Sequence, residues 1–349
     1  MAYTTIDNPE LYFQCKNYVG SSSAQSITLD GSEDMQPDFI WFKNRETSSR
    51  HQLYDSVRGA TKLINSDDDD AEQTVSYFTS FDSDGFTIPS GSSALNGGSQ
   101  NIIAWCWKAG TSFSNDASST GVGTIDSSGS VSDTAGFSII IRTGTASAGT
   151  IKHGLSTTPK MIITKMRNAT ESWGIYHVGI GNTKYLKLDV NDAEDSSSVV
   201  WNNTTPTASV FSVGSSALVN GSGKTYVDYI FSEVKGYSKF GSYTGNGNAD
   251  GPFVYTGFRP AWILYKNTAR SISWLIHDNK RLGYNPDNDE QHPDTTAADG
   301  SDDRADILSN GFKIRESSNL MNVSGEQVIY MAFAESPFVN SNGVPNNAR

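Results

Sequence analysis

The chain has little of several features that would classify a protein at once. It holds only two cysteines and 18% charged residues in 349 residues, and no long apolar run. Two cysteines exclude a disulfide framework, and a membrane-spanning helix needs about 18 or more consecutive apolar residues. The start, MAYTTIDNPELYFQ, lacks the basic and apolar regions of a signal peptide. We therefore expect assembly in a cytoplasm, without membrane insertion.

Positive charge is also scarce. The sequence has 26 Lys and Arg against 38 Asp and Glu, a formal net charge of -12. Nucleic-acid binding depends on clustered basic residues that neutralise phosphates, and an anionic membrane surface makes the same demand. The charge balance therefore argues against both kinds of partner.

The two cysteines lie in apolar, strand-like sequence. Cys15 stands in YFQCKNY and Cys106 in IIAWCWKAG. Isolated cysteines in such runs are typical of buried, reduced thiols. We expect both to be core residues.

One short sequence, which we call the phrase, occurs three times and marks the repeated units of the chain. It begins at Pro37 (PDFIWFKN), Pro159 (PKMIITKM) and Pro260 (PAWILYKN), 122 and 101 residues apart. Counted from each proline, position +3 is Ile, position +6 is Lys and position +16 is Leu or Ile. These residues are Ile40, Ile162 and Ile263, then Lys43, Lys165 and Lys266, then Leu53, Ile175 and Ile276. Internal repetition at fixed register indicates duplicated structural units.

Each phrase predicts a β-hairpin. The runs are short, rich in β-branched and aromatic residues, and bounded by proline at the entry and a polar turn at the exit. A glycine precedes each phrase by 15 to 17 residues, and each unit closes with a glycine turn and an apolar run. We expect position +3 and position +16 to point inward.

The sequence therefore predicts an all-β chain of three tandem, related antiparallel β-sandwich, jelly-roll-like domains. Their predicted ranges are 1–110, 131–234 and 235–349, with a Ser/Gly-rich linker at 111–130 and an acidic loop insertion in the third. The three domains could stand in a row as a shaft, or surround a pseudo-threefold axis as a knob. The sequence leaves both arrangements open.

The recurrent lysines and nearby tryptophans are candidate ligand-binding residues. A lysine kept at one register can line three equivalent sites, and exposed tryptophans can stack against sugar rings. The alternative is structural: a strand lysine that covers apolar neighbours or pairs with an acid, and tryptophans in the core. The candidate set is Trp41, Lys43, Trp173, Lys165, Trp262, Lys266 and Trp274.

Two acidic segments, Asp67–Asp70 and residues 285–306, offer oxygen ligands for calcium. Neither matches the spacing of a known calcium loop, so a solvated insertion at a variable tip is the alternative. The candidate metal ligands are Asp287, Asp289, Asp302 and Asp303. No other cofactor is expected.

No catalytic motif accompanies the five histidines. The sequence has no GxSxG, no HExxH and no spaced Cys/His ligand set. We expect a protein that is not an enzyme.

Several phrases together resemble a family of repeat-containing structural proteins of tailed, mostly marine, bacteriophages, often described as tail fibre-like. They are QPDFIWFKNR with LYDSVRGATK, FTSFDSDGFTI, IIAWCWKAG, GFSIIIRTGTASAGTIKHGLSTTPKMIITKMR and YMAFAESPF. The resemblance covers nearly the whole chain. It implies a β-sandwich component of a virion, assembled in the host cytoplasm, and it carries no catalytic residues.

The resemblance leaves the role open. A tail fibre or receptor-binding protein would contact a host surface glycan or receptor, whereas a head decoration or tail adaptor would contact only virion proteins. In either role we expect contacts with further copies of the chain, for which a trimer is one candidate assembly. A depolymerase that cleaves glycans would need two carboxylates at a defined separation. Exposed Trp or Tyr beside an acidic loop would favour adhesion, and large apolar patches would favour assembly.

Overall fold

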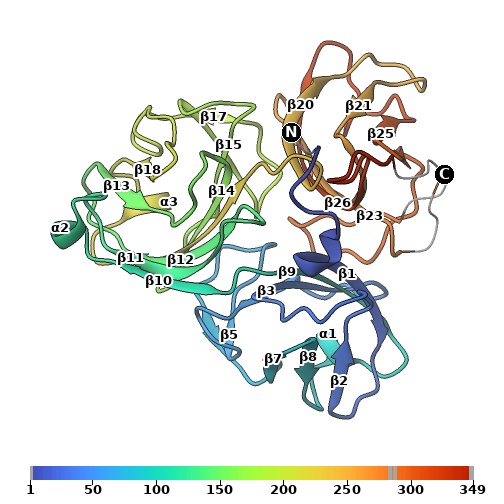
Figure 1. Ribbon diagram of the computed structural model, residues 1–349, viewed down its shortest axis with the longest axis horizontal. Coiled ribbons are helices and arrows are strands. Elements are labelled where there is room, and N and C mark those ends of the chain that lie inside the picture. The colour runs from blue at the N-terminus through green and yellow to red at the C-terminus, as the bar shows by residue number, and fades with distance from the viewer. Residues whose placement is uncertain (1–2, 282–284, 286–288, 346–349) are drawn as a thin grey trace.

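The computed structural model describes residues 3–281, 285 and 289–345. The regular secondary structure of the chain is almost wholly antiparallel strand, as the sequence predicts. We divide it into unit one (13–107), unit two (111–232) and unit three (238–337), which form three lobes in Figure 1.

Unit one follows a short 3-10 helix, η1 (Pro9–Leu11). Its elements are β1 (Phe13–Val19), β2 (Gln25–Thr28), β3 (Phe39–Asn44), β4 (Gln52–Asp55), β5 (Lys62–Leu63), β6 (Gln73–Thr74), β7 (Ser80–Asp82), β8 (Gly85–Ile88), α1 (Ser93–Asn96) and β9 (Asn101–Trp107). Unit two comprises β10 (Thr111–Asn115), α2 (Ala117–Thr120), β11 (Ser127–Ser132), β12 (Phe137–Thr143), β13 (Gly149–Lys152), β14 (Pro159–Met166), β15 (Gly174–His177), β16 (Lys184–Lys187), β17 (Asp195–Ser196), β18 (Val210–Val213), α3 (Ala217–Asn220) and β19 (Thr225–Ser232). Unit three comprises β20 (Ser238–Thr244), β21 (Phe253–Tyr255), β22 (Phe258–Asn267), β23 (Leu275–Asp278), β24 (Ala305–Leu308), β25 (Gly311–Ile314) and β26 (Gln327–Pro337).

The three units share one topology. Their large sheets share a four-strand order: β1-β9-β3-β4 in unit one, β12-β19-β14-β15 within the eight-stranded sheet of unit two, and β20-β26-β22-β23 in unit three. A smaller sheet accompanies each: β2-β8-β7, β13-β18 and β21-β25-β24. The repeated phrase supplies the hairpins β3–β4, β14–β15 and β22–β23, and the closing apolar run lies in the middle of each large sheet.

The units surround a common centre rather than standing in a row. Each has a private core between its two sheets, while a fourth cluster draws side chains from all three large sheets. In Figure 1 the large sheets of the three lobes face this centre. Of the two arrangements that the sequence leaves open, the structure has the pseudo-threefold one.

The two recurrent apolar positions of the phrase serve different cores. The isoleucines at position +3 are all 0% exposed and lie in the private cores of their units. Leu53, Ile175 and Ile276 at position +16 are at most 1% exposed and lie in the shared cluster. Both positions are buried, as predicted, but the large sheets are buried on two faces.

The recurrent glycine before each phrase permits a close approach between two backbone segments. A Cβ at Gly20 would lie 2.0 Å from the carbonyl oxygen of Gly97, and one at Gly144 would lie 2.4 Å from that of Gly221. In unit three, a Cβ at Gly245 would lie 2.3 Å from the carbonyl oxygen of Val323. Any side chain would collide with backbone at all three places.

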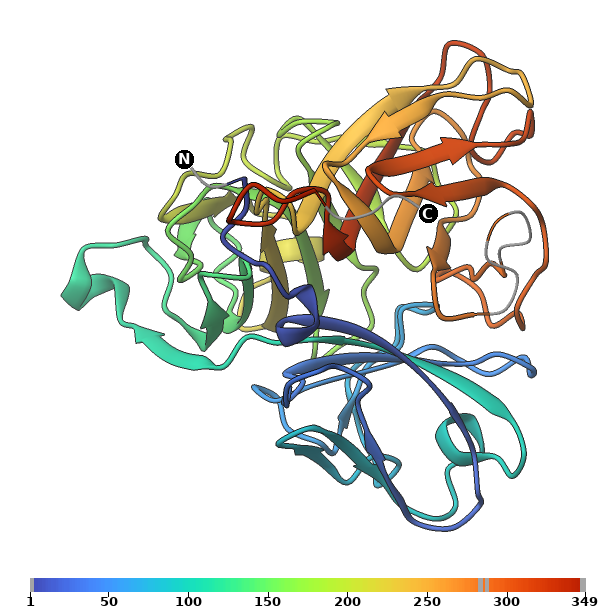
Figure 2. The same cartoon turned by 45° about the vertical axis from the view of Figure 1, so that its right-hand side comes forward.

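The segment 111–130, predicted as a linker, forms β10, α2 and the first part of β11 instead. The two strands pair with each other and extend the large sheet of unit two beyond β12. Ladder hydrogen bonds come from the backbone, so a Ser/Gly/Thr composition does not prevent pairing at a sheet edge. Figure 2 shows this extension protruding from the side of unit two.

The prediction of buried, reduced thiols is confirmed. Cys15 and Cys106 are free, buried and on adjacent paired strands, where Cys15 lies opposite Trp105. Burial raises the pKa of both thiols, so the reactive thiolate is disfavoured. Among the described residues, no helix has the length and apolar character needed to cross a membrane.

Candidate functional site: the contacts between units

The recurrent lysines join each unit to its neighbour. Lys43, Lys165 and Lys266 are at most 1% exposed. Besides carbonyls of its own hairpin, each ammonium donates a hydrogen bond to one carbonyl in another unit. Lys165 reaches Asp69 O in unit one at 3.0 Å, Lys266 reaches Asn191 O in unit two at 3.0 Å, and Lys43 reaches Thr296 O in unit three at 3.2 Å. Unit two therefore contacts unit one, unit three contacts unit two, and unit one contacts unit three, so the contacts form a cycle.

An aromatic ring N–H makes a second cyclic contact from position +14 of the phrase. Trp173 Nε1 donates to Asn65 O at 2.9 Å, and Trp274 Nε1 donates to Lys187 O at 2.8 Å. Unit one has His51 at this position, and its Nε2 lies 3.1 Å from His292 O. Trp41 Nε1 donates to His51 Nδ1, which leaves Nε2 as the protonated nitrogen.

A backbone hydrogen bond makes the third contact. The carbonyls of Arg45, Arg167 and Thr268, two residues after each lysine, accept from N–H groups of the neighbouring unit. The donors are Asp299 N, Glu72 N and Glu194 N, each at 2.8 Å.

The groups so contacted have the same spacing in every unit. The two carbonyls are four residues apart, and the N–H follows the second by three residues. We call residues 65–72, 187–194 and 292–299 the contact segments. Each hairpin binds one contact segment by the same three kinds of hydrogen bond. The three interfaces are therefore equivalent in this respect, and they close a ring.

The residue at position +18 of each phrase is polar and also contacts another unit. These contacts run in the direction opposite to that of the lysines: from unit one to unit two, from unit two to unit three, and from unit three to unit one. Asp55 accepts from Tyr229 Oη of unit two at 2.7 Å, and Asp278 accepts from Trp105 Nε1 of unit one at 2.9 Å. In unit two this position is His177, whose Nε2 lies 3.1 Å from Tyr330 O of unit three. The two aspartates are each paired with an arginine three residues later, Arg58 and Arg281.

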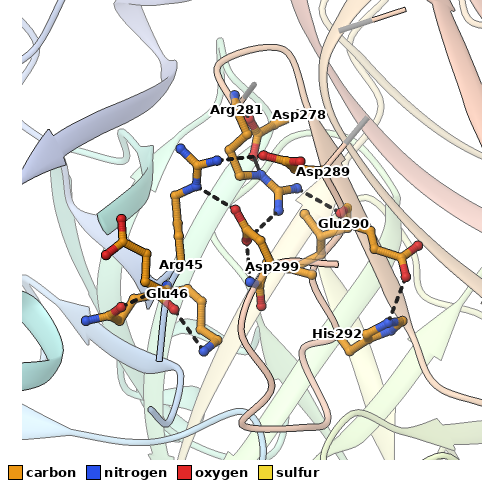
Figure 3. Close-up of polar contacts among 12 residues, drawn as sticks. Arg45, Glu46, Asp278, Arg281, Asp289, Glu290, His292 and Asp299 are labelled. Atoms are coloured by element: carbon orange, nitrogen blue, oxygen red, sulfur yellow. Dashed lines mark hydrogen bonds and ion pairs between the residues drawn. The ribbon is translucent and has the colours of Figure 1, made fainter. Parts of the chain in front are cut away.

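The interface between units three and one carries the densest charge network (Figure 3). Arg45 bridges Asp289 at 2.7 Å and Asp299 at 2.6 Å, and Arg281 joins Asp299 to Asp278. The acidic insertion of unit three therefore meets arginines of both units. Two of its carboxylates, Asp289 and Asp299, are paired with arginines at this interface.

Burial sets the protonation behaviour of these groups. It lowers the pKa of Lys43, Lys165 and Lys266 to about 8, against the attraction of nearby carboxylates. Burial also lowers the pKa of His177 to about 4 and that of His51 well below its ordinary value. Both histidines are therefore neutral near pH 7, as their paired donor and acceptor roles require.

The structure corrects the expectation that the tryptophans and lysines bind a ligand from solution. Trp41, Trp173, Trp262 and Trp274 are at most 2% exposed, so none presents a ring face to a sugar. All four lie in the shared cluster. The ammonium groups of the three lysines donate hydrogen bonds to backbone carbonyls at the interfaces. The structural alternative holds for the tryptophans, which are core residues, whereas the lysine ammonium groups are buried and bind backbone carbonyls, which neither interpretation of the sequence predicted.

The acidic segments are also not free tips. Asp289 is paired with Arg45, Asp302 is paired with Arg304, and Asp303 is exposed. Asp287 lies outside the described residues. Over residues 3–281, 285 and 289–345, no three His, Cys, Asp or Glu side chains gather as a metal site would require. Both segments instead run along interfaces, where Asp69 O and Thr296 O accept from lysines.

The contact segments themselves were missed by sequence reasoning, although a signal was present. DDAE at 69–72 and NDAE at 191–194 are 122 residues apart, the same interval as the first two anchor prolines. Unit three has TAAD at 296–299. Recognition uses backbone groups of these segments, so side-chain identity is only weakly repeated.

Lys165→Met tests the lysine contact. The variant leaves Asp69 O and Glu171 O without their buried donor, and each such loss costs about 1–3 kcal/mol. We expect the free energy of unfolding, measured by chemical denaturation, to fall by about 3 kcal/mol. Lys160→Met, at a partly exposed position of the same strand, should change it by less than about 0.5 kcal/mol. Equal losses in both variants would contradict the lysine's interface role.

The fold and these contacts define an all-β protein in which three related sandwiches close into a pseudo-threefold ring. A family model described as a domain of unknown function (DUF7483) matches residues 8–337, which take in all three units. The chain belongs to this family. No match was found among curated proteins.

Proposed function

We propose that this chain is a non-enzymatic structural protein of a bacteriophage virion, a tail fibre-like component that contacts the host surface. The observation that carries the proposal is the use of the repeated polar residues. Lysines, ring N–H groups and histidines of the hairpins all bind backbone of a neighbouring unit. Such a closed ring is a rigid support whose outer loops remain available for binding.

The resemblance of the repeated phrases to tail fibre-like proteins supports the virion location. A single chain with three equivalent units also suits an assembly built on threefold symmetry, because its units present related surfaces around one axis. Further copies of this chain and other virion proteins are the proposed partners, together with a host glycan or receptor.

A head decoration or tail adaptor is the second candidate, and one surface feature favours it. Phe253 and Tyr255 are 47% and 52% exposed and point the same way from β21, an edge strand of its sheet. Neighbouring exposed aromatics of this kind are enriched where proteins meet.

Gold-labelled antibodies against the purified chain, applied to particles of the phage that encodes it, test the proposal. We expect label at the distal tail, and we expect saturable binding of the purified chain to host cells. Label on the head would favour the decoration role. Particles that carry no label would overturn the virion proposal altogether.

A further inference from the structure

Unit two carries a groove, formed where its large sheet is extended. Strands β10 and β11 and the loop between them supply one wall, and the end of β12 supplies the other. Over the residues that the structure describes, the large sheets of units one and three have no counterpart of β10 and β11. The extension that carries the groove protrudes from unit two in Figure 2, and all residues that line the groove are described.

The size and shape of the groove suit a small extended ligand. Its volume is about 600 Å³, within the range of roughly 300–1,000 Å³ found for ligand sites. The groove is open, because much of its wall is exposed, including Ser114, Asp116, Asp126 and Thr143. Ile125 and Ile141 add an apolar strip.

The lining combines donors and acceptors without a net positive field. Asp116 and Asp126 are exposed carboxylates that still have free oxygen lone pairs. Arg167 also lines the groove, but its charge is paired with Glu72, and the charge of Arg142 is paired with Asp228. An anionic ligand would therefore meet two uncompensated carboxylates.

Several polar groups of the lining are unused by the protein. The hydroxyls of Ser114, Ser128 and Thr143 make no hydrogen bond to the described chain. A ligand with many hydroxyl groups, each able to donate and accept, would satisfy such a mixed set.

We propose that this groove binds a neutral oligosaccharide. Its hydroxyls donate to Asp116 and Asp126 and accept from the serine and threonine hydroxyls, while its C–H faces lie against Ile125 and Ile141. The inference rests on the proposed function in one respect: the host surface supplies the glycan. It differs from the sequence-based expectation, since no tryptophan or lysine takes part.

Binding of the full chain to an array of bacterial surface oligosaccharides, neutral and anionic, tests the inference. Thr143→Arg and Ser128→Arg place a long side chain into the groove from positions that are exposed or half-exposed. Thr244→Arg is the matched control, because Thr244 is the exposed counterpart of Thr143 in unit three, whose large sheet has the four strands β20-β26-β22-β23 and no such extension among the described residues.

We expect the wild type and Thr244→Arg to bind neutral glycans and both groove variants to lose at least tenfold in affinity. Unchanged binding by the groove variants, binding to anionic glycans only, or binding to no glycan would each overturn the inference. Antibody label on the tail together with any of these results would leave the proposed function standing. If particles carry no label but glycan binding depends on the groove, the proposed virion function would be contradicted and the inference about the groove would stand.

Discussion

Arg58→Met is expected to lower the free energy of unfolding by about 4 kcal/mol. The side chains of Arg58 and Asp55 are both 0% exposed. The guanidinium donates to Asp55, to the carbonyls of Leu53 and Lys62, and to Tyr229 of the neighbouring unit. Its removal leaves a buried carboxylate without a counterion at the interface of units one and two. Chemical denaturation at pH 7.5 measures the loss.

Two controls separate charge pairing from the mere loss of a long side chain. Arg270→Met removes an arginine that is 43% exposed and paired with Glu326, so its loss should cost less than about 1 kcal/mol. In the double variant Asp55→Asn with Arg58→Met, no unpaired charge is buried, and we expect part of the stability to return. A loss for Arg58→Met no larger than that for Arg270→Met would contradict the role of the pair.

Acid is expected to unfold the ring between about pH 6 and pH 4. Burial lowers the pKa of His177 and His153 to about 4 and that of His277 to about 3, below the ordinary 6.5. In this window the unfolded chain binds more protons than the folded chain, so stability falls as pH falls. Each histidine contributes a loss of roughly 3 kcal/mol near pH 4, at about 1.4 kcal/mol per pKa unit. Together they approach the whole stability of a typical domain.

His177→Gln tests the acid sensitivity of the interface between units two and three. Glutamine can still donate to Tyr330 O and accept from Gly179 N, the two bonds that His177 makes, but it does not titrate. Denaturation curves at pH 7.5, 5.5 and 4.5 should therefore show a shallower loss of stability in the variant. An unchanged slope would contradict the prediction.

His292→Gln is the control of opposite sign. Burial alone would lower the pKa of His292, but its hydrogen bond to Glu290 and the charge of that carboxylate raise it above the ordinary value. This histidine therefore adds stability as pH falls, and its removal should steepen the acid loss rather than reduce it.

The hairpins, their inward residues and the all-β class could be predicted from the sequence because repetition fixes the register. The sequence also contained a sign of the shared cluster, but the repeat of the phrases did not reveal it. DFIWFKN does not alternate, and β3 is buried at every residue. Continuous burial is expected of a strand covered on both faces. One face meets the private core and the other meets the ring centre.

The interfaces could not be predicted from side-chain chemistry. A lysine suggests contact with solvent, and a run of aspartates suggests a metal site. In the structure, however, the ammonium of Lys165 donates a hydrogen bond to the backbone carbonyl of Asp69. Backbone groups are the same in every residue, so only the spacing of the contact segments repeats. The groove was missed for a related reason, since Ser/Gly-rich sequence at 111–130 has no periodicity that predicts strands.

Hydrogen exchange at three backbone amides tests the ring most directly. Glu72 N, Glu194 N and Asp299 N each donate only across an interface, to Arg167 O, Thr268 O and Arg45 O. The ring predicts slow exchange at all three, with similar protection. Fast exchange at Asp299 with protection at Glu72 and Glu194 would mean that unit three does not close on unit one, and would contradict the account.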